Sequence, residues 1–157
     1  MCFEYLDTTA LAEVVELAER SDPYAWPQAQ WRSSLRDDWV LAKRKGGKLV
    51  GLLVLKLSFF ETELLYLLLA PEARRQGLAA ALLDKSLAHS QTLNAERMLL
   101  EVRVSNESAI ALYTGRGFVR EGRRKNYYPL LAEDSIAAGK GFEDALLFTH
   151  WFIEPPD

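Results

Sequence analysis

The spacing of hydrophobic and polar residues changes several times along the chain, and each change marks the boundary of an expected helix or strand. Strands are expected over residues 3–6, 39–43, 48–57, 63–69, 97–104, 118–125 and 144–152. Helices are expected over residues 28–35, 79–94 and 106–115, and one more begins after Thr8 or Thr9 and follows the apolar positions Leu11, Val14, Val15 and Leu17. The alternation of the two kinds of element indicates an α/β protein.

Two local features indicate how these elements are connected. Gly46 and Gly47 separate two strands and tolerate the positive φ of a tight turn, so the sheet should begin with an antiparallel hairpin. The run 63–69 is largely apolar, which is typical of a strand covered on both faces. The helix and strand that follow fit a right-handed crossover, so we expect a mixed sheet with helices on both faces and a ligand at the strand ends.

The composition narrows the class of protein. A chain of 157 residues, of which 49% are hydrophobic, fits a single domain spanning residues 1–157. Its longest apolar run, residues 64–71, is far shorter than the roughly 20 residues that cross a bilayer, and no signal-like segment follows Met1. We therefore expect a cytoplasmic protein with no membrane partner.

Charge and cysteine content exclude further classes. A net charge of −3 gives no general attraction to nucleic acid, and the basic run 123–125 is interpreted as a solvated strand end. Cys2 is the single cysteine, so no internal disulfide can form, and the histidines His89 and His150 do not supply zinc-ligand spacing. We expect no nucleic-acid partner and no metal.

One segment has the pattern of an anion-binding turn. It reads Arg74-Arg75-Gln76-Gly77-Leu78-Ala79 and lies where an apolar strand gives way to a helix. The first N–H groups of a helix lack internal partners, and together with the helix dipole they can bind a phosphate. The alternative is a plain helix start with solvated arginines, which the hexapeptide alone does not exclude.

The same segment resembles the pyrophosphate-binding pattern of the GNAT acetyltransferase superfamily, Arg/Gln-x-x-Gly-x-Gly/Ala, at Arg74, Gly77 and Ala79. Further motifs resemble the RimI-type family of bacterial ribosomal-protein-alanine N-acetyltransferases. They are Leu100-Glu101-Val102-Arg103-x-Ser105-Asn106, Ala109, Leu112-Tyr113, Gly117-Phe118, Asn126-Tyr127-Tyr128-Pro129 and Glu143-Asp144-Ala145. The resemblance covers about residues 63–148 and extends more loosely through Trp26-Pro27 to the N-terminus.

This resemblance implies a GNAT fold, an α/β structure with a central mixed sheet of about seven strands flanked by about four helices. It implies acetyl-CoA as cosubstrate and a protein N-terminal peptide as acceptor, with the alanine of ribosomal protein S18 as the first expectation. It also implies that residues 74–79 hold the pyrophosphate and that the backbone N–H groups of Leu67, Leu68 and Leu69 polarise the thioester oxygen. The family more usually has an Asn-Ile-Ala-Val-like run there, so bulky Leu68 is expected to narrow the acetyl site.

Two side chains are candidates for proton transfer. Glu101 interrupts an apolar strand, and a carboxylate in such a place needs a charged or hydrogen-bonding partner or has a functional role. It could pair with Arg103, two positions on and on the same face, or accept the proton of an acceptor α-amine, whose pKa is ~8. Tyr113, with a reference pKa of ~10, could donate a proton to the departing CoA thiolate or could simply pack in the core. The resemblance favours Glu101 as base and Tyr113 as acid in a direct transfer.

The remaining candidates concern the cofactor's surroundings and the acceptor. Asn106 is expected to cap a helix, with a cofactor contact as a second role. Tyr127, Tyr128 and, in the loop 22–27, Trp26 are candidate acceptor-binding residues, although plain hydrophobic packing is the alternative and all four tryptophans are interpreted as core or loop anchors. The segment 130–142 is longer than is usual in the family, and it could reshape the acceptor site or be inert.

Two other functions stay open. One is acetylation of a small-molecule amine, and the other is a non-catalytic acetyl-CoA-binding module. The presence of both Glu101 and Tyr113 counts against the module.

Overall fold

The computed structural model describes residues 1–157 and divides into two compact units, Met1–Ala95 (unit 1) and Glu96–Asp157 (unit 2). Unit 1 contains strands β1 (Glu4–Tyr5), β2 (Trp39–Lys45), β3 (Lys48–Leu57) and β4 (Glu61–Leu69), helices α1 (Leu11–Ser21), α2 (Gln28–Asp37) and α3 (Leu78–Thr92), and two short 3-10 helices, Thr8–Ala10 and Pro71–Ala73. Unit 2 contains strands β5 (Arg97–Arg103), β6 (Val119–Pro129) and β7 (Phe142–Trp151) and helices α4 (Glu107–Gly115) and α5 (Ala132–Ala138). The number of strands is the one predicted, and there is one α-helix more than expected.

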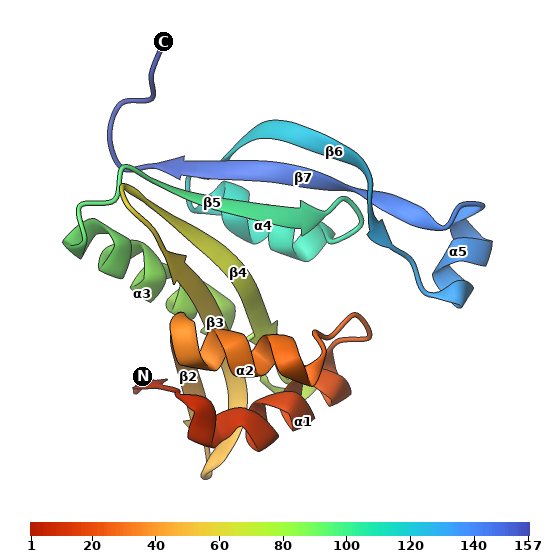
Figure 1. Cartoon of the computed structure of the whole chain (residues 1–157), viewed down its shortest axis with the longest axis horizontal. Helices are drawn as coiled ribbons and strands as arrows, with labels where there is room; N and C mark the ends of the chain where they lie inside the picture. Colours follow the sequence, from red (N-terminus) through yellow and green to blue (C-terminus); the bar gives the residue numbers. More distant parts are fainter. The chain divides into compact units, whose positions relative to one another are not determined.

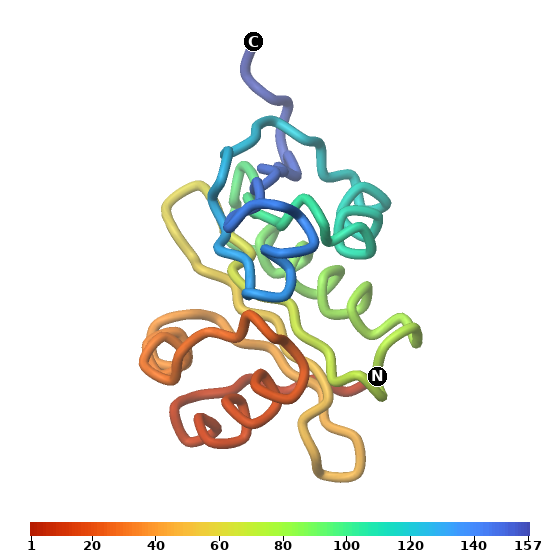
Figure 2. The backbone as a smooth tube through the Cα atoms, turned by 90° about the vertical axis from the view of Figure 1, so that its right-hand side faces the viewer, coloured from red at the N-terminus to blue at the C-terminus, as the bar shows by residue number.

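The strands of unit 1 pair antiparallel in the order β1-β2-β3-β4. Helices α1 and α2 lie on one face of these strands and α3 lies on the other, as Figures 1 and 2 show from two directions. Strand β3 is therefore buried on both faces, and the core contains Leu52, Leu53, Val54 and Leu55, all 0% exposed. Both α1 and α3 contact β4, but of residues 63–69, predicted to be covered on both faces, only Leu64 and Leu68 are buried and the others are half-buried, so the covering is partial.

The hairpin predicted at the glycine pair is confirmed. Gly46 and Gly47 have φ of 58° and 77°, the left-handed values that a two-residue turn between twisted strands requires. The cap predicted for the first helix is displaced by one or two residues. Asp7 caps the 3-10 turn that precedes α1, and its carboxylate accepts from the Thr9 N–H at 2.9 Å.

The strands of unit 2 also pair antiparallel, with β7 between β5 and β6. Strand β6 extends four residues beyond the predicted end at residue 125, and its register against β7 shifts between Arg124 and Tyr128. The segment 130–142, considered above only as a long loop, contains α5, which lies at the tip of unit 2 where β6 leads into β7 (Figure 1). None of the helices in the chain combines the length and apolar character needed to cross a membrane.

Candidate active site

The residues predicted for the site are distributed over both units. Unit 1 carries the pyrophosphate segment 74–79, the strand residues 67–69 and Trp26. Unit 2 carries Glu101, Asn106, Tyr113 and the tyrosine pair 127–128.

The segment 74–79 forms a turn that leads into helix α3. Gly77 is the N-cap residue with φ of 78°, a left-handed conformation that favours glycine, and no side chain caps the helix that begins at Leu78. The N–H groups of the first turn are thus left without a side-chain cap, and the positive end of the helix dipole adds to them. This geometry fits the anion site predicted from the sequence.

Side chains of unit 1 fix this turn in place. The Arg74 guanidinium donates to the backbone oxygen of Ser21 at 2.8 Å, at the end of α1, and the Gln76 amide donates to the backbone oxygen of Glu72 at 3.1 Å. Arg20 in turn donates two hydrogen bonds of 3.0 Å to the Glu72 carboxylate. Arg74 therefore ties the turn to α1 and Gln76 ties it to the preceding 3-10 helix, although both side chains are exposed, as is Arg75.

The strand residues predicted to polarise the thioester follow an irregularity in β4. Leu67, Leu68 and Leu69 pair with Leu53, Leu52 and Gly51 of β3, and a bulge lies between them and the start of the strand. A bulge interrupts the regular ladder of backbone hydrogen bonds and re-aims the strand next to it. Leu68 is 4% exposed and packs in the core of unit 1, whereas its neighbours on either side are half-buried.

Trp26 belongs to an aromatic cluster with Trp31 and Tyr66. The three ring centroids lie 4.7 to 4.8 Å from one another. Asp22 fixes the loop that carries Trp26, because its carboxylate accepts from the Tyr24 N–H at 2.8 Å and from the Tyr66 hydroxyl. This packing fits the interpretation of Trp26 as an anchor, and its half-buried ring still leaves part of the indole accessible.

Buried and half-buried residues alternate along strand β5, so the strand has one buried face and one half-buried face. Glu101 lies on the half-buried face. Its side chain is 23% exposed, and its Oε1 atom lies 3.0 Å from Nε of Arg124 on strand β6. Arg103, the partner considered from the sequence, donates to the backbone oxygen of Pro129 at 3.2 Å and lies 3.8 Å from Glu143. The carboxylate that interrupts the apolar strand therefore has a cationic partner from a strand that sequence reasoning did not indicate.

Tyr113 is buried near the end of helix α4. It is 7% exposed, and its ring centroid lies 5.7 Å from that of Phe118. Burial, with a smaller contribution from Tyr128, raises the pKa of the Tyr113 hydroxyl. The hydroxyl therefore stays protonated at neutral pH, which both a proton donor and a packed core tyrosine require.

The tyrosine pair of β6 is held by two arginines. The rings of Tyr127 and Tyr128 lie 5.0 Å apart in an edge-to-face arrangement. The guanidinium of Arg103 lies 4.6 Å from the Tyr128 ring centroid, and that of Arg124 lies 5.4 Å from the Tyr127 ring centroid. Burial, followed by the nearby charge of Glu101, raises the pKa of Tyr128 to about 12.

Asp144 organises the bulge that carries Tyr127, a role that sequence reasoning missed. Three residues of β6, 125–127, oppose Asp144 alone in the register of the two strands. The Asp144 carboxylate accepts from the Asn126 N–H at 2.9 Å and from Arg123, and these two contacts, in that order, lower its pKa. Asn126 has φ of 50°, so Asp144 stabilises a left-handed residue inside the strand.

Two further features complete the description of the candidate residues. Asn106 caps α4 as expected, because its side chain accepts from the Ala109 N–H at 3.3 Å. No group of three or more His, Cys, Asp or Glu side chains in the chain gathers where it could hold a metal ion.

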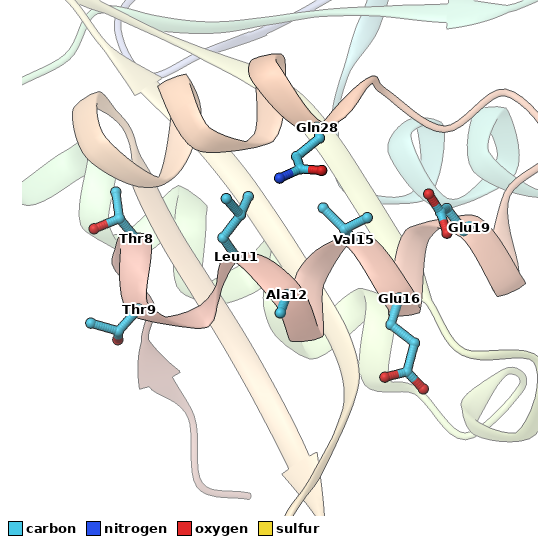
Figure 3. Close-up of a pocket in the computed structure, with 8 residues that line it drawn as sticks. All are labelled: Thr8, Thr9, Leu11, Ala12, Val15, Glu16, Glu19 and Gln28. Carbon is cyan, nitrogen blue, oxygen red and sulfur yellow. The ribbon is translucent and has the colours of Figure 1, made fainter.

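A hollow on unit 1 contains none of the residues predicted for the cofactor or the acceptor. It runs along α1, from the preceding 3-10 helix to Glu19, and includes Gln28 at the start of α2 (Figure 3). Its lining residues are Thr8, Thr9, Leu11, Ala12, Val15, Glu16, Glu19 and Gln28.

Two comparisons with known proteins give matches over most of the chain. The model of the acetyltransferase (GNAT) family matches residues 7–118. The [ribosomal protein bS18]-alanine N-acetyltransferase of Escherichia coli strain K12 is 30% identical over 134 residues, which cover 83% of this chain and 90% of that protein.

Solved structures match over almost the whole chain. The crystal structure of the ribosomal-protein-S18-alanine N-acetyltransferase from Escherichia coli aligns with a TM-score of 0.86 and 26% identity, covering 99% of this chain and 96% of that one. Arabidopsis thaliana NAA60 in complex with acetyl-CoA aligns with a TM-score of 0.80 and 18% identity, covering 96% and 98%, which concerns the fold alone. The α/β fold and the family resemblance predicted from the sequence are confirmed.

Proposed function

The chain belongs to the GNAT family of acetyltransferases, and on this premise we propose that it transfers the acetyl group of acetyl-CoA to the N-terminal α-amine of a protein. The observation that carries the proposal is in unit 2, where the half-buried Glu101 carboxylate belongs to the same cluster as the Tyr127-Tyr128 pair. A carboxylate can accept the proton of an α-ammonium group, and tyrosine rings and hydroxyls suit a peptide backbone. The similarity to an enzyme named for alanine acetylation of a ribosomal protein supports the same acceptor class.

The proposed reaction is a direct transfer between two bound substrates. The α-ammonium loses a proton to Glu101, either directly or through water, and the free amine attacks the thioester carbonyl carbon. The new N–C bond forms, the C–S bond then breaks, and the CoA thiolate takes the proton of the Tyr113 hydroxyl. The nitrogen loses its second proton to water as the neutral amide forms, and water returns a proton to the Tyr113 phenolate. Cys2 is exposed near the chain start, and no acyl-enzyme is required.

The residues of unit 1 would hold the donor substrate. The N-terminus of α3, which no side chain caps, would supply N–H groups for the pyrophosphate together with the turn 74–77. Asn106 of unit 2 is a further candidate contact. The backbone N–H groups of Leu67 to Leu69 would accept the charge that develops on the thioester oxygen. Polarisation by N–H groups depends on backbone position, so the unusual leucines of this strand do not remove it.

The roles of the two proton-transfer residues are tested by conservative substitution. Glu101→Gln and Tyr113→Phe keep size and shape but remove the proton acceptor and the proton donor, so each should lower kcat by about a hundredfold or more. Glu107→Gln, an exposed acid at the start of α4, is the matched control and should retain near wild-type turnover. Unchanged kcat in both site variants, with unchanged melting temperatures, would refute the assigned roles.

The acceptor class is tested at the tyrosine pair. Tyr127 is 46% exposed and lies outside the core, so Tyr127→Ala should fold normally. We expect it to raise KM for a peptide acceptor at least tenfold while transfer to a small amine changes little. Equal losses with both acceptors would favour a small-molecule amine, and acetyl-CoA binding without any transfer would favour a non-catalytic module.

The alanine terminus of ribosomal protein S18 is the proposed cellular acceptor, which would place the reaction in the cytoplasm. This choice rests on the similarity to the Escherichia coli enzyme. A free α-amine on alanine is the only feature of that acceptor that the chemistry of unit 2 requires.

A further inference from the structure

Arg124 reaches Glu101 across an intervening strand. In the register of unit 2, Glu101 of β5 opposes Leu147 of β7, and Ala145 of β7 opposes Arg124 of β6. Residues two apart on a strand share a face, so Glu101 and Arg124 project from the same side of the three strands. On this face of the middle strand, Leu147 lies beside Glu101 and Ala145 lies beside Arg124. The small methyl group of Ala145 leaves room for the arginine to cross.

The contact that results is a partly exposed ion pair. Nε of Arg124 lies 3.0 Å from Oε1 of Glu101, and the two side chains are 54% and 23% exposed. Pairs with this much water access contribute little to stability, because solvent screens the charges and the long side chain loses entropy. Another cation can therefore replace the guanidinium at a small cost.

In the same position, Arg124 also contacts the ring of Tyr127. Its guanidinium carbon is 5.4 Å from the ring centroid of Tyr127, within the range of a cation–π contact. Arg103, the other arginine of this cluster, differs in being only 17% exposed, with a hydrogen bond to the Pro129 backbone and a position over Tyr128. Arg103 is held by several contacts, whereas the more exposed Arg124 contacts the Glu101 carboxylate and the Tyr127 ring at the same time.

We propose that Arg124 is a positioning residue that occupies the Glu101 carboxylate while the acceptor site is empty and gives way to the α-ammonium group of the acceptor. The inference rests on the function proposed above and adds the way in which the acceptor gains access to the base. A single carboxylate beside two cations leaves an uncompensated positive charge, so the arriving ammonium repels the guanidinium from the carboxylate, while the Tyr127 ring that it already contacts remains its partner. The exchange involves no bond making, and the acceptor enters as the charged amine.

This arrangement makes the acceptor's positive charge a requirement for binding. A peptide whose N-terminus is blocked has no cation to replace Arg124 at the carboxylate. Arg124 therefore disfavours the binding of neutral ligands, which cannot replace it at the carboxylate. It also competes with the charged acceptor.

The test is the peptide KM of Arg124 variants at saturating acetyl-CoA. Arg124→Gln removes the competing cation and should lower the peptide KM about two- to fivefold, the range expected for an exposed ion pair, with a smaller change in kcat. Arg124→Lys keeps a cation near Glu101 and should stay close to wild type. Arg120→Gln, an exposed arginine on the same strand, is the matched control and should leave KM unchanged.

A double-mutant cycle separates this role from a structural one. In a Glu101→Gln background, the Arg124→Gln change should no longer alter the peptide dissociation constant, because the carboxylate for which the two cations compete is absent. Melting temperatures of all variants serve as the folding control. Persistence of the affinity gain without the carboxylate would contradict the exchange.

The outcomes distinguish this inference from the proposed function. A peptide KM that rises in Arg124→Gln, in an enzyme whose wild type turns over peptides, would overturn the exchange and leave the function intact. Absence of turnover by the wild type with every free-amine peptide would overturn the proposed function, and the exchange with it. A lower KM in Arg124→Gln together with a wild-type-like Arg124→Lys supports both.

Discussion

Three carboxylates of unit 2, Glu101, Glu143 and Asp144, have different surroundings. Glu101 is half-buried and paired with an exposed arginine, which suits a group that must exchange partners. Glu143 is 7% exposed and accepts from the Ser105 hydroxyl, and Asp144 is 8% exposed and holds the bulge of β6. Burial and hydrogen bonding therefore divide these acids into one candidate for chemistry and two that shape its surroundings.

The role of Asp144 leads to a pH-dependent stability prediction. Its pKa is lowered in the folded state by the Asn126 N–H and by Arg123, so the stabilisation is present above the unfolded-state pKa of about 4 and is lost as pH falls below it. Asp144→Asn should lower the melting temperature at pH 7, and the difference from wild type should shrink below about pH 4. Thermal unfolding followed by circular dichroism at several pH values measures this.

Asp134, an exposed acid in the first turn of α5, provides the control for the same series. Asp134→Asn should show a much smaller pH-dependent difference. A melting temperature of Asp144→Asn equal to wild type at pH 7 would show that the bulge is held by other contacts.

These residue roles could be predicted only in part. Glu101 and Tyr113 were identified because a carboxylate in an apolar strand and a tyrosine near a helix end are visible in the sequence itself. The pairing of Glu101 with Arg124 was not predicted, because it crosses β7, whose register no local pattern determines. The bulge at residues 125–127 depends likewise on Asp144, which lies 18 positions from Asn126.

At the scale of elements, the turn into α3 links conformation to cofactor binding. Gly77 needs a left-handed φ of 78° to aim the first N–H groups of the helix, and a Cβ there would meet no neighbouring atom within 4 Å. Any effect of a side chain at this position must therefore come from backbone strain. The strain of alanine at such a φ is about 1 kcal/mol.

Gly77→Ala should therefore lower the melting temperature slightly and weaken acetyl-CoA binding about tenfold, because a relaxed turn re-aims the N–H groups. Isothermal titration calorimetry with acetyl-CoA measures the affinity. Gly115→Ala, at a glycine with no positive φ and no atom within 4 Å of a new Cβ, should bind acetyl-CoA as the wild type does. Equal affinities for the two variants would argue against a pyrophosphate site at this turn.

Hydrophobic periodicity predicted most helices and strands of the chain and missed one helix. Helices α1 to α3 and the strands of unit 1 were predicted within a few residues, because each buries a face against a neighbour and so carries a regular apolar pattern. Helix α5 was missed because none of its seven residues is buried, so no pattern could reveal it. Its formation depends on local effects, including Glu133 and Asp134 in the first turn and a left-handed Gly139 at its end.

At the scale of the whole molecule, the predicted site draws on both units. The donor-binding candidates come mainly from residues before Ala95, and the proton-transfer and acceptor candidates come from residues after Glu96. The prediction of a single domain over residues 1–157 stays a prediction. The family match, which runs from residue 7 to residue 118, includes residues of both units.

The central claim is that the chain acetylates the free N-terminal amine of a peptide. The most direct test is steady-state CoA release by the purified full chain with acetyl-CoA and a short peptide beginning with alanine, compared with the same peptide carrying a blocked N-terminus. We expect turnover with the free α-amine and only background release with the blocked peptide. Equal release with both peptides, or none with either despite measured acetyl-CoA binding, would contradict the claim.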